Sequence, residues 1–215
     1  MKSIDIIVEP ERVDRYKKGI KYSFPNCAAV ILLRTDDDKN ILVDTGGYGH
    51  QKRVVDGLRR KGLNPEDIHY VILTHSHFDH NANIYLFSRA QLIQERWLVS
   101  IADGKTIKYG RKEELPPIGA KGIRLIKTPG HTEDSISVLV RHKNKKYAIV
   151  GDAVKGSLIR AGLIKREYSN SQDYLNNMKK LFRISNVIIS GDDGLIEGET
   201  FTELKKLLKN VKIER

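Results

Sequence analysis

The sequence contains a single cysteine, Cys27, among its 215 residues. One cysteine cannot form an intrachain disulfide, and a cysteine-based zinc site requires several thiolates. Cys27 lies between Asn26 and the apolar run 28–33, which favours a small buried side chain over a nucleophile. A function based on cysteine chemistry is therefore not expected.

Long apolar runs are also missing. No segment approaches the roughly 18 uninterrupted apolar residues that a membrane-spanning helix needs. Residues 1–5 include an acid and a base where a secretory signal peptide has apolar side chains. No linker rich in proline, glycine or serine divides the chain. We therefore expect one domain over residues 1–215, in the cytoplasm, with no membrane as partner.

Short runs rich in valine, isoleucine and leucine recur instead, and such runs are typical of strands buried on both faces. They lie at residues 28–33, 41–43, 70–73, 90–93, 123–126, 136–140, 147–150 and 187–189. Helical spacing of apolar residues predicts helices within 54–63, 174–182 and 204–211. The last of these places Leu204, Leu207, Leu208 and Val211 in the core. The expected fold class is α/β.

Five of the predicted strands lead into polar segments that carry potential ligands. These segments contain Asp44, residues 74–80, His131, Asp152 and the pair Asp192 and Asp193. Groups that follow several strands of an α/β fold can converge on one rim, where such folds commonly place their sites. The sequence therefore predicts one site built from all five segments.

Histidine is concentrated in these segments, which hold four of the seven histidines in the chain. His75 and His77 are two residues apart, so an extended chain can point both at one ion, whereas a helix would turn them apart. Imidazoles with carboxylates suit zinc, and the lack of thiolates leaves iron or manganese open. These residue types indicate a divalent transition metal.

The number of candidate ligands exceeds what one ion can use. They are His75, His77, Asp79, His80, His131, Asp152 and an acid at Asp192 or Asp193. Two ions can use them, with a carboxylate and a water bridging the pair. Such a pair lowers the pKa of the water and generates a hydroxide nucleophile. We therefore expect a dinuclear centre, with zinc as the first choice of metal.

Four ordered motifs lie between about residues 41 and 190. They are Asp44-Thr45-Gly46, His75-x-His77-x-Asp79-His80, Thr128-Pro129-Gly130-His131 and Gly151-Asp152. Their order and spacing resemble those of the metallo-β-lactamase superfamily of hydrolases. The resemblance implies an αβ/βα four-layer sandwich with a two-metal site between the edges of its sheets.

The resemblance also implies a role for each motif residue. His75, His77 and His131 would hold the first ion, Asp79 and His80 the second, and Asp152 would bridge the two. Asp44 would hold the His75 loop without binding metal. Asp79 and Asp152 are the expected catalytic carboxylates, with Asp79 or a metal-bound water handling the proton.

The last motif departs from the family pattern. The superfamily usually has a Gly-His pair there, whereas this chain reads Gly191-Asp192. We interpret Asp192 as a ligand that replaces the histidine, which would favour manganese or iron at the second position. A ligand at Asp193 instead, or a purely structural turn, stays open as an alternative.

Charge bears on the substrate. The formal net charge is +11, and residues 141–183 contain eleven lysines and arginines against three acids, a net of +8. This stretch includes Asp152 and a predicted loop at residues 155–160, so part of the positive field is expected near the metals. Such a field favours an anionic substrate, and RNA or another phosphodiester is the expected partner. A solvated lysine-rich surface is the alternative reading of the same charge.

Other functions remain open on the same residues. Superfamily members that resemble glyoxalase II open thioesters, and others open lactones or β-lactams with the same ligands. A non-catalytic nucleic-acid-binding protein with a degenerate second metal site is the alternative from a different class. The sequence leaves homodimer formation open.

Overall fold

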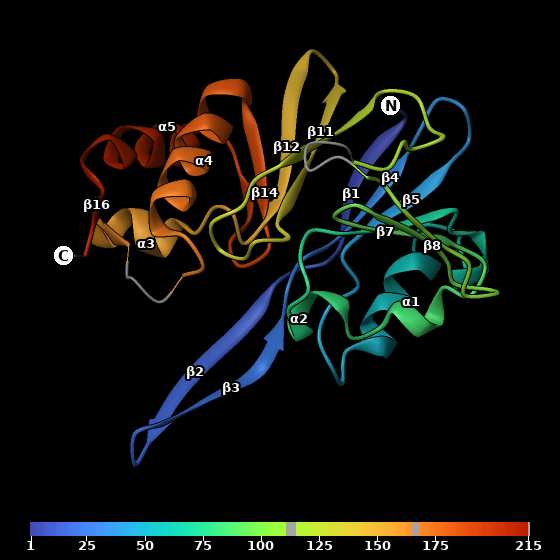
Figure 1. Cartoon of the computed structure of the whole chain (residues 1–215), viewed down its shortest axis with the longest axis horizontal. Helices are drawn as coiled ribbons and strands as arrows, with labels where there is room; N and C mark the ends of the chain where they lie inside the picture. Colours follow the sequence, from blue (N-terminus) through green and yellow to red (C-terminus); the bar gives the residue numbers. More distant parts are fainter. Residues whose placement is uncertain (111–114, 165–167, 215) are drawn as a thin grey trace.

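Two β-sheets packed face to face form the centre of the computed structural model, which describes residues 1–110, 115–164 and 168–214 (Figure 1). The first sheet, in spatial order, contains β1 (Ser3–Val8), β4 (Val30–Arg34), β5 (Asn40–Val43), β6 (Tyr70–Leu73), β7 (Gln91–Gln94), β8 (Trp97–Ser100) and β9 (Thr106–Lys108). The second contains β10 (Ile123–Lys127), β11 (Ile136–His142), β12 (Lys145–Gly151), β14 (Val187–Ser190) and β15 (Gly194–Ile196). Strands β5, β6 and β7 are parallel neighbours, as are β12 and β14, and the other pairs within these sheets are antiparallel.

The strands pack on both faces because their side chains alternate between two apolar surroundings. On β4, Val30 and Leu32 belong to the core against the outer helix, whereas Ile31 belongs to the core between the sheets. On β12, Val150 faces the outer helices and Ile149 faces the first sheet. This double burial explains why these strands read as continuous apolar runs.

Helices cover the outer face of each sheet, which gives four layers (Figure 1). Helix α1 (Gln51–Arg59) packs on the first sheet, and α3 (Gly156–Ala161), α4 (Ser171–Ile184) and α5 (Gly198–Leu207) pack on the second. Asn170 caps the N-terminus of α4, where its side chain accepts a hydrogen bond from the backbone N–H of Asp173 at 2.9 Å. The expected αβ/βα sandwich is confirmed.

A hairpin of β2 (Glu11–Lys17) and β3 (Ile20–Cys27) projects away from the sandwich (Figure 1). Every residue of β2 is exposed, and most of β3 is exposed or half-buried. The hairpin was not among the predicted strands, although Ile20, Tyr22 and Phe24 alternate with polar residues along β3. The base of the hairpin lies beside the segment that follows β6. There the backbone N–H of Ala28 donates a hydrogen bond to the Asp79 carbonyl at 3.0 Å.

Smaller elements complete the chain. They are α2 (Phe78–Asn81), β13 (Leu163–Ile164), β16 (Lys212–Ile213) and the 3-10 turns Pro65–Asp67, Ile84–Leu86 and Leu208–Asn210. Strands β13 and β16 pair in parallel beside the outer helices of the second sheet. Among the helices of the described residues, none has the length and apolarity needed to cross a membrane.

Each of the eight predicted strands and three predicted helices overlaps an observed element. Two details were wrong. Leu207 is 37% exposed, because it lies at the end of α5 where the stripe of Leu204 and Leu208 turns away from it. Residues 155–160 are not a loop, because α3 begins at Gly156. Cys27 is buried as expected, and this burial raises the pKa of its thiol.

Candidate metal centre

The segment after β6 carries three of the four site histidines. His75 and His77 lie in non-helical chain between the end of β6 and the start of α2 at Phe78. His77 has an extended backbone, with φ −69° and ψ 149°. The expectation that these two histidines do not lie on a helix is confirmed, while Asp79 and His80 occupy the first turn of α2.

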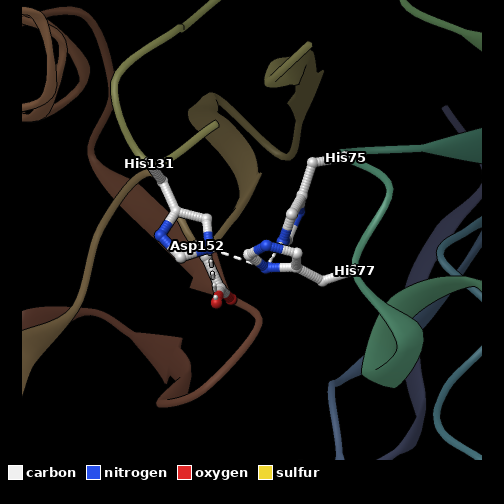
Figure 2. A group of neighbouring side chains, drawn as sticks. All are labelled: His75, His77, His131 and Asp152. Carbon is white, nitrogen blue, oxygen red and sulfur yellow. Dashed lines mark hydrogen bonds and ion pairs between the residues drawn. The ribbon is translucent and has the colours of Figure 1, made fainter. Parts of the chain in front are cut away.

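Four side chains from three segments point toward one another (Figure 2). One nitrogen or oxygen from each of His75, His77, His131 and Asp152 lies within 4.8 Å of the others. His77 Nδ1 lies 3.0 Å from His75 Nε2 and 3.0 Å from His131 Nε2. His131 Nε2 lies 3.3 Å from Asp152 Oδ2. Ligands of a tetrahedral zinc ion, at roughly 2.0–2.1 Å from the metal, are about 3.3 Å apart, so these spacings fit a divalent ion.

The protonation of the histidines suits this role. Burial lowers the pKa of His75 well below its usual value, and it lowers the pKa of His131 to about 4. Both imidazoles are therefore neutral near pH 7 and have a lone pair to offer a metal. Three imidazole nitrogens and one carboxylate oxygen are a donor set for zinc or a similar transition metal.

The buried Asp44 connects Thr74, which precedes His75, with His80 in α2. Its carboxylate accepts hydrogen bonds from the backbone N–H of Thr74 at 2.8 Å and from the Thr74 hydroxyl at 2.8 Å. The same carboxylate lies 2.7 Å from Nδ1 of His80. The Thr74 oxygen is also 3.2 Å from Nδ1 of His75, which leaves Nε2 of His75 to face the other ligands. Asp44 thus orients the His75 loop, as the resemblance implied.

His80 lies between two buried carboxylates. Its Nε2 is 3.1 Å from Asp152 Oδ1, and its Nδ1 faces Asp44. Burial alone would lower the pKa of His80, but the Asp44 and Asp152 carboxylates outweigh burial and raise this pKa well above its usual value. Burial alone would raise the pKa of Asp152, and Lys155 and His80 hold it well below the usual range. Asp152 is therefore ionised, inside a fixed network of hydrogen bonds and ion pairs.

Three of the predicted ligands lie outside the group of four. Both ring nitrogens of His80 contact carboxylates, those of Asp44 and Asp152. The carboxylates of Asp79 and Asp192 lie near the cations Arg12 and Lys155. Asp193 has a different task, since its Oδ2 accepts the backbone N–H of Gly156 at 2.7 Å at the start of α3. A second ion at Asp79, His80 and Asp192 stays a prediction.

Two cations complete the site: the sequence placed Lys155 in a basic stretch near the metals but did not predict its contacts, and it did not single out Arg12. Lys155 is only 11% exposed, and its Nζ lies 2.8 Å from Asp152 Oδ2 and 2.6 Å from Asp192 Oδ2. Arg12, from the projecting hairpin, places Nη1 3.9 Å from Asp79 Oδ2 and 3.8 Å from Asp192 Oδ1. No motif contains either residue. The one available signal was the position of Lys155 three residues after Asp152.

Comparison with known proteins agrees with this fold. The profile of the metallo-β-lactamase superfamily matches residues 26–191. A probable metallo-hydrolase of Methanocaldococcus jannaschii is 31% identical over 163 residues, which cover 74% of this chain and 73% of that protein. Metallo-β-lactamase domain-containing protein 1 of Xenopus laevis is 35% identical over 102 residues, or 46% of this chain and 43% of that protein.

A solved structure shows the same fold. A protein of Thermotoga maritima described as a putative metallo-β-lactamase superposes with a TM-score of 0.65 at 20% identity, covering 91% of this chain and 98% of that one. The layers and the histidine site define a metal-dependent hydrolase. The chain belongs to the metallo-β-lactamase superfamily.

Proposed function

We propose that the protein hydrolyses small uncharged acyl compounds, lactones or thioesters, at this centre. The ligand group opens into a cavity of about 830 Å³, which suits a small molecule. The observation that carries the substrate class is the charge of the cavity lining. Its described residues include three cations, Arg12, Lys21 and Lys155, and five carboxylates, Asp14, Asp79, Asp152, Asp192 and Asp193.

The lining has two more carboxylates than cations, so one divalent cation would bring its net charge to about zero. A cavity that is close to neutral when loaded gives no strong attraction to a phosphodiester backbone. The same balance argues against a strong positive field at the centre, which the sequence had led us to expect. Lys155 is paired with two carboxylates, and Arg160 lies 3.4 Å from Glu203. Lys165 and Arg166, which belong to the basic stretch 141–183, lie outside the described residues.

The side chains divide the work of hydrolysis as follows. The three histidines and Asp152 would hold a divalent ion, which when bound would supply Lewis-acid polarisation of the acyl carbonyl and a more acidic water. Asp79 lines the cavity beside His77 and accepts the proton of the attacking water. His80 and Asp44 keep Asp152 ionised and in place. Tyr168 and Leu158 give part of the cavity wall an apolar surface for the acyl group.

A substrate panel on the zinc-loaded protein tests this proposal. We expect turnover of a neutral lactone and a thioester, with slower turnover of a bis-aryl phosphodiester of similar size. His77→Ala is the control, because it removes one ligand and should abolish every metal-dependent rate. Faster turnover of the phosphodiester would contradict the proposed substrate class.

A second candidate, hydrolysis of single-stranded RNA, is favoured by the projecting hairpin. Tyr16 is 73% exposed and Phe24 is 81% exposed, and Tyr22 is exposed as well. Basic side chains of the same hairpin stand among them, at Arg15, Lys17, Lys18 and Lys21. Exposed aromatic rings among cations are the combination that binds single strands by stacking and by charge.

The hairpin can be tested apart from the metal centre. In this second reading, replacing Tyr16, Tyr22 and Phe24 by alanine should abolish RNA binding. A matched variant with alanine at the exposed Tyr85 and Trp97, which lie outside the hairpin, should retain it. The logarithm of affinity should also fall with that of salt concentration, by about 0.7 per phosphate contact. Salt-independent RNA binding, or none at low salt, would leave the acyl hydrolase alone.

A further inference from the structure

The residues expected to hold a second ion do not fit one in this structure. Among the described residues, a single group of histidine and carboxylate side chains comes close enough to hold a metal, and it is His75, His77, His131 and Asp152. Asp79, His80 and Asp192 are not part of it. His80 places both ring nitrogens against the Asp44 and Asp152 carboxylates, Lys155 contacts Asp192, and Asp79 lies 3.9 Å from the guanidinium of Arg12.

The ammonium of Lys155 lies where the second ion would meet its carboxylates. Asp152 would have to bridge the two ions and Asp192 would have to complete the second site. Lys155 Nζ is 2.8 Å from Asp152 Oδ2 and 2.6 Å from Asp192 Oδ2, so it bridges these two oxygens itself. These are the short separations of charge-assisted hydrogen bonds.

The backbone holds Lys155 in this position. Lys155 is the residue before α3, and the next residue, Gly156, donates its N–H to Asp193 at 2.7 Å. Ser190, at the end of β14, accepts the N–H of Asp193 through its hydroxyl at 3.4 Å and donates that hydroxyl to the Val154 carbonyl at 2.7 Å. The start of α3 is thereby fixed to the loop that carries Asp192.

Close packing and positive charge both disfavour a second metal ion at this position. A side chain at Gly191 would come within 2.6 Å of both Asp152 Oδ1 and His80 Cε1, so the chain is already closely packed around these groups. Arg12 adds a second positive charge, 3.8 Å from Asp192 and 3.9 Å from Asp79. A divalent ion would have to displace an ammonium from a mostly buried pair of carboxylates and approach this guanidinium.

We infer that the centre holds one metal ion and that the Lys155 ammonium, bridging Asp152 and Asp192, takes the place of the second. The loss of the usual last histidine and the presence of Lys155 are then two parts of one change. An imidazole is replaced by a carboxylate, and the carboxylate is neutralised by an ammonium. Asp192 is a partner of Lys155 and not a metal ligand.

Metal stoichiometry tests this inference without any substrate. The protein is saturated with Zn²⁺, freed of excess ion by gel filtration, and analysed for zinc per chain by elemental analysis and native mass spectrometry. We expect one ion in the wild type. Lys155→Ala should rise toward two, because it frees Asp152 and Asp192 beside Asp79 and His80. Lys155→Arg, which keeps a cation there, should remain at one.

Lys145→Ala is a matched control, since Lys145 pairs with Glu197 on the surface and should not change the count. Two ions in the wild type would overturn the inference even if no Lys155 variant folds. One ion in both the wild type and a folded Lys155→Ala would overturn the role of the ammonium. The inference rests on the proposed function only through the first ion, so a failed substrate panel with one bound zinc would count against the substrate class alone.

Discussion

The site has two sides, which both consist of histidine and aspartate side chains but differ in their surroundings. The His75 side contains His75, His77 and His131, and the Asp192 side contains Asp79, His80 and Asp192, with Asp152 between them. On the His75 side, imidazole nitrogens face one another at 3.0 Å, and burial keeps His75 and His131 neutral. On the Asp192 side, carboxylates face the cations Lys155 and Arg12. A ligand motif therefore specifies which groups are present, whereas residues outside the motif decide whether those groups are free to bind metal.

The largest effect should come from dismantling the His75 side. His77→Ala combined with His131→Ala removes two of three imidazoles, so we expect a folded protein with much less than one metal per chain and no hydrolysis. Elemental analysis and circular dichroism measure the two properties. His142→Ala is the control, because that ring contacts the Met1 carbonyl, away from the site. Retained metal and activity in the double variant would remove the basis of the comparison.

The next effect concerns the support beneath both sides. Asp44→Ala leaves the buried His80 without one of its two carboxylates and the Thr74 N–H without its acceptor. Breaking one partner of a buried pair costs about 3–5 kcal/mol, which urea unfolding of the metal-free protein measures. Asp36→Ala, at an exposed position, should stay within about 0.5 kcal/mol of the wild type. Equal stability of the two variants would show that Asp44 does not support the site.

The His75 side could be predicted from the sequence because each of its residues stands in a motif that follows a predicted strand. Closely spaced histidines after an apolar run predict ligands after a strand, and β6 ends as that pattern requires. The double burial of β4 and β12 likewise gave apolar runs that predicted strands. In these segments the apolar residues adjacent in sequence are also the residues that the fold buries, so the sequence pattern predicts the strands.

The Asp192 side could not be predicted, because its partners come from distant segments. A lysine at the start of a short helix reads as exposed, and Lys155 is buried only because Asp152 and Asp192 compensate its charge. Arg12 lies in a hairpin that was not among the predicted strands, and its approach to Asp79 and Asp192 depends on how that hairpin packs in the fold. The sequence also could not decide which of Asp192 and Asp193 faces the site, because the answer depends on a tertiary contact. The backbone N–H of Gly156 donates a hydrogen bond to Asp193.

A smaller effect separates these adjacent acids. Asp193→Ala removes the acceptor of the Gly156 N–H at the start of α3 and should cost about 1 kcal/mol in unfolding free energy. Asp192→Ala should leave the zinc count at the wild-type value, because Asp192 binds Lys155. Chemical unfolding and elemental analysis of both variants measure this contrast. A drop in zinc with Asp192→Ala alone would return Asp192 to the ligand set.

The smallest effect should come from Arg12, and it sharpens the comparison by separating the two cations. Its Nη1 is 3.8–3.9 Å from the carboxylates, whereas Lys155 Nζ approaches to 2.6 and 2.8 Å, and Arg12 is 31% exposed against 11% for Lys155. A partly exposed pair at this separation is worth under about 1 kcal/mol. Arg12→Gln should therefore keep one zinc per chain and change the unfolding free energy little, as should Arg15→Gln, a control on the same exposed strand. Binding of a second zinc by Arg12→Gln, but not by Arg15→Gln, would show that the hairpin, and not Lys155 alone, keeps the second ion out.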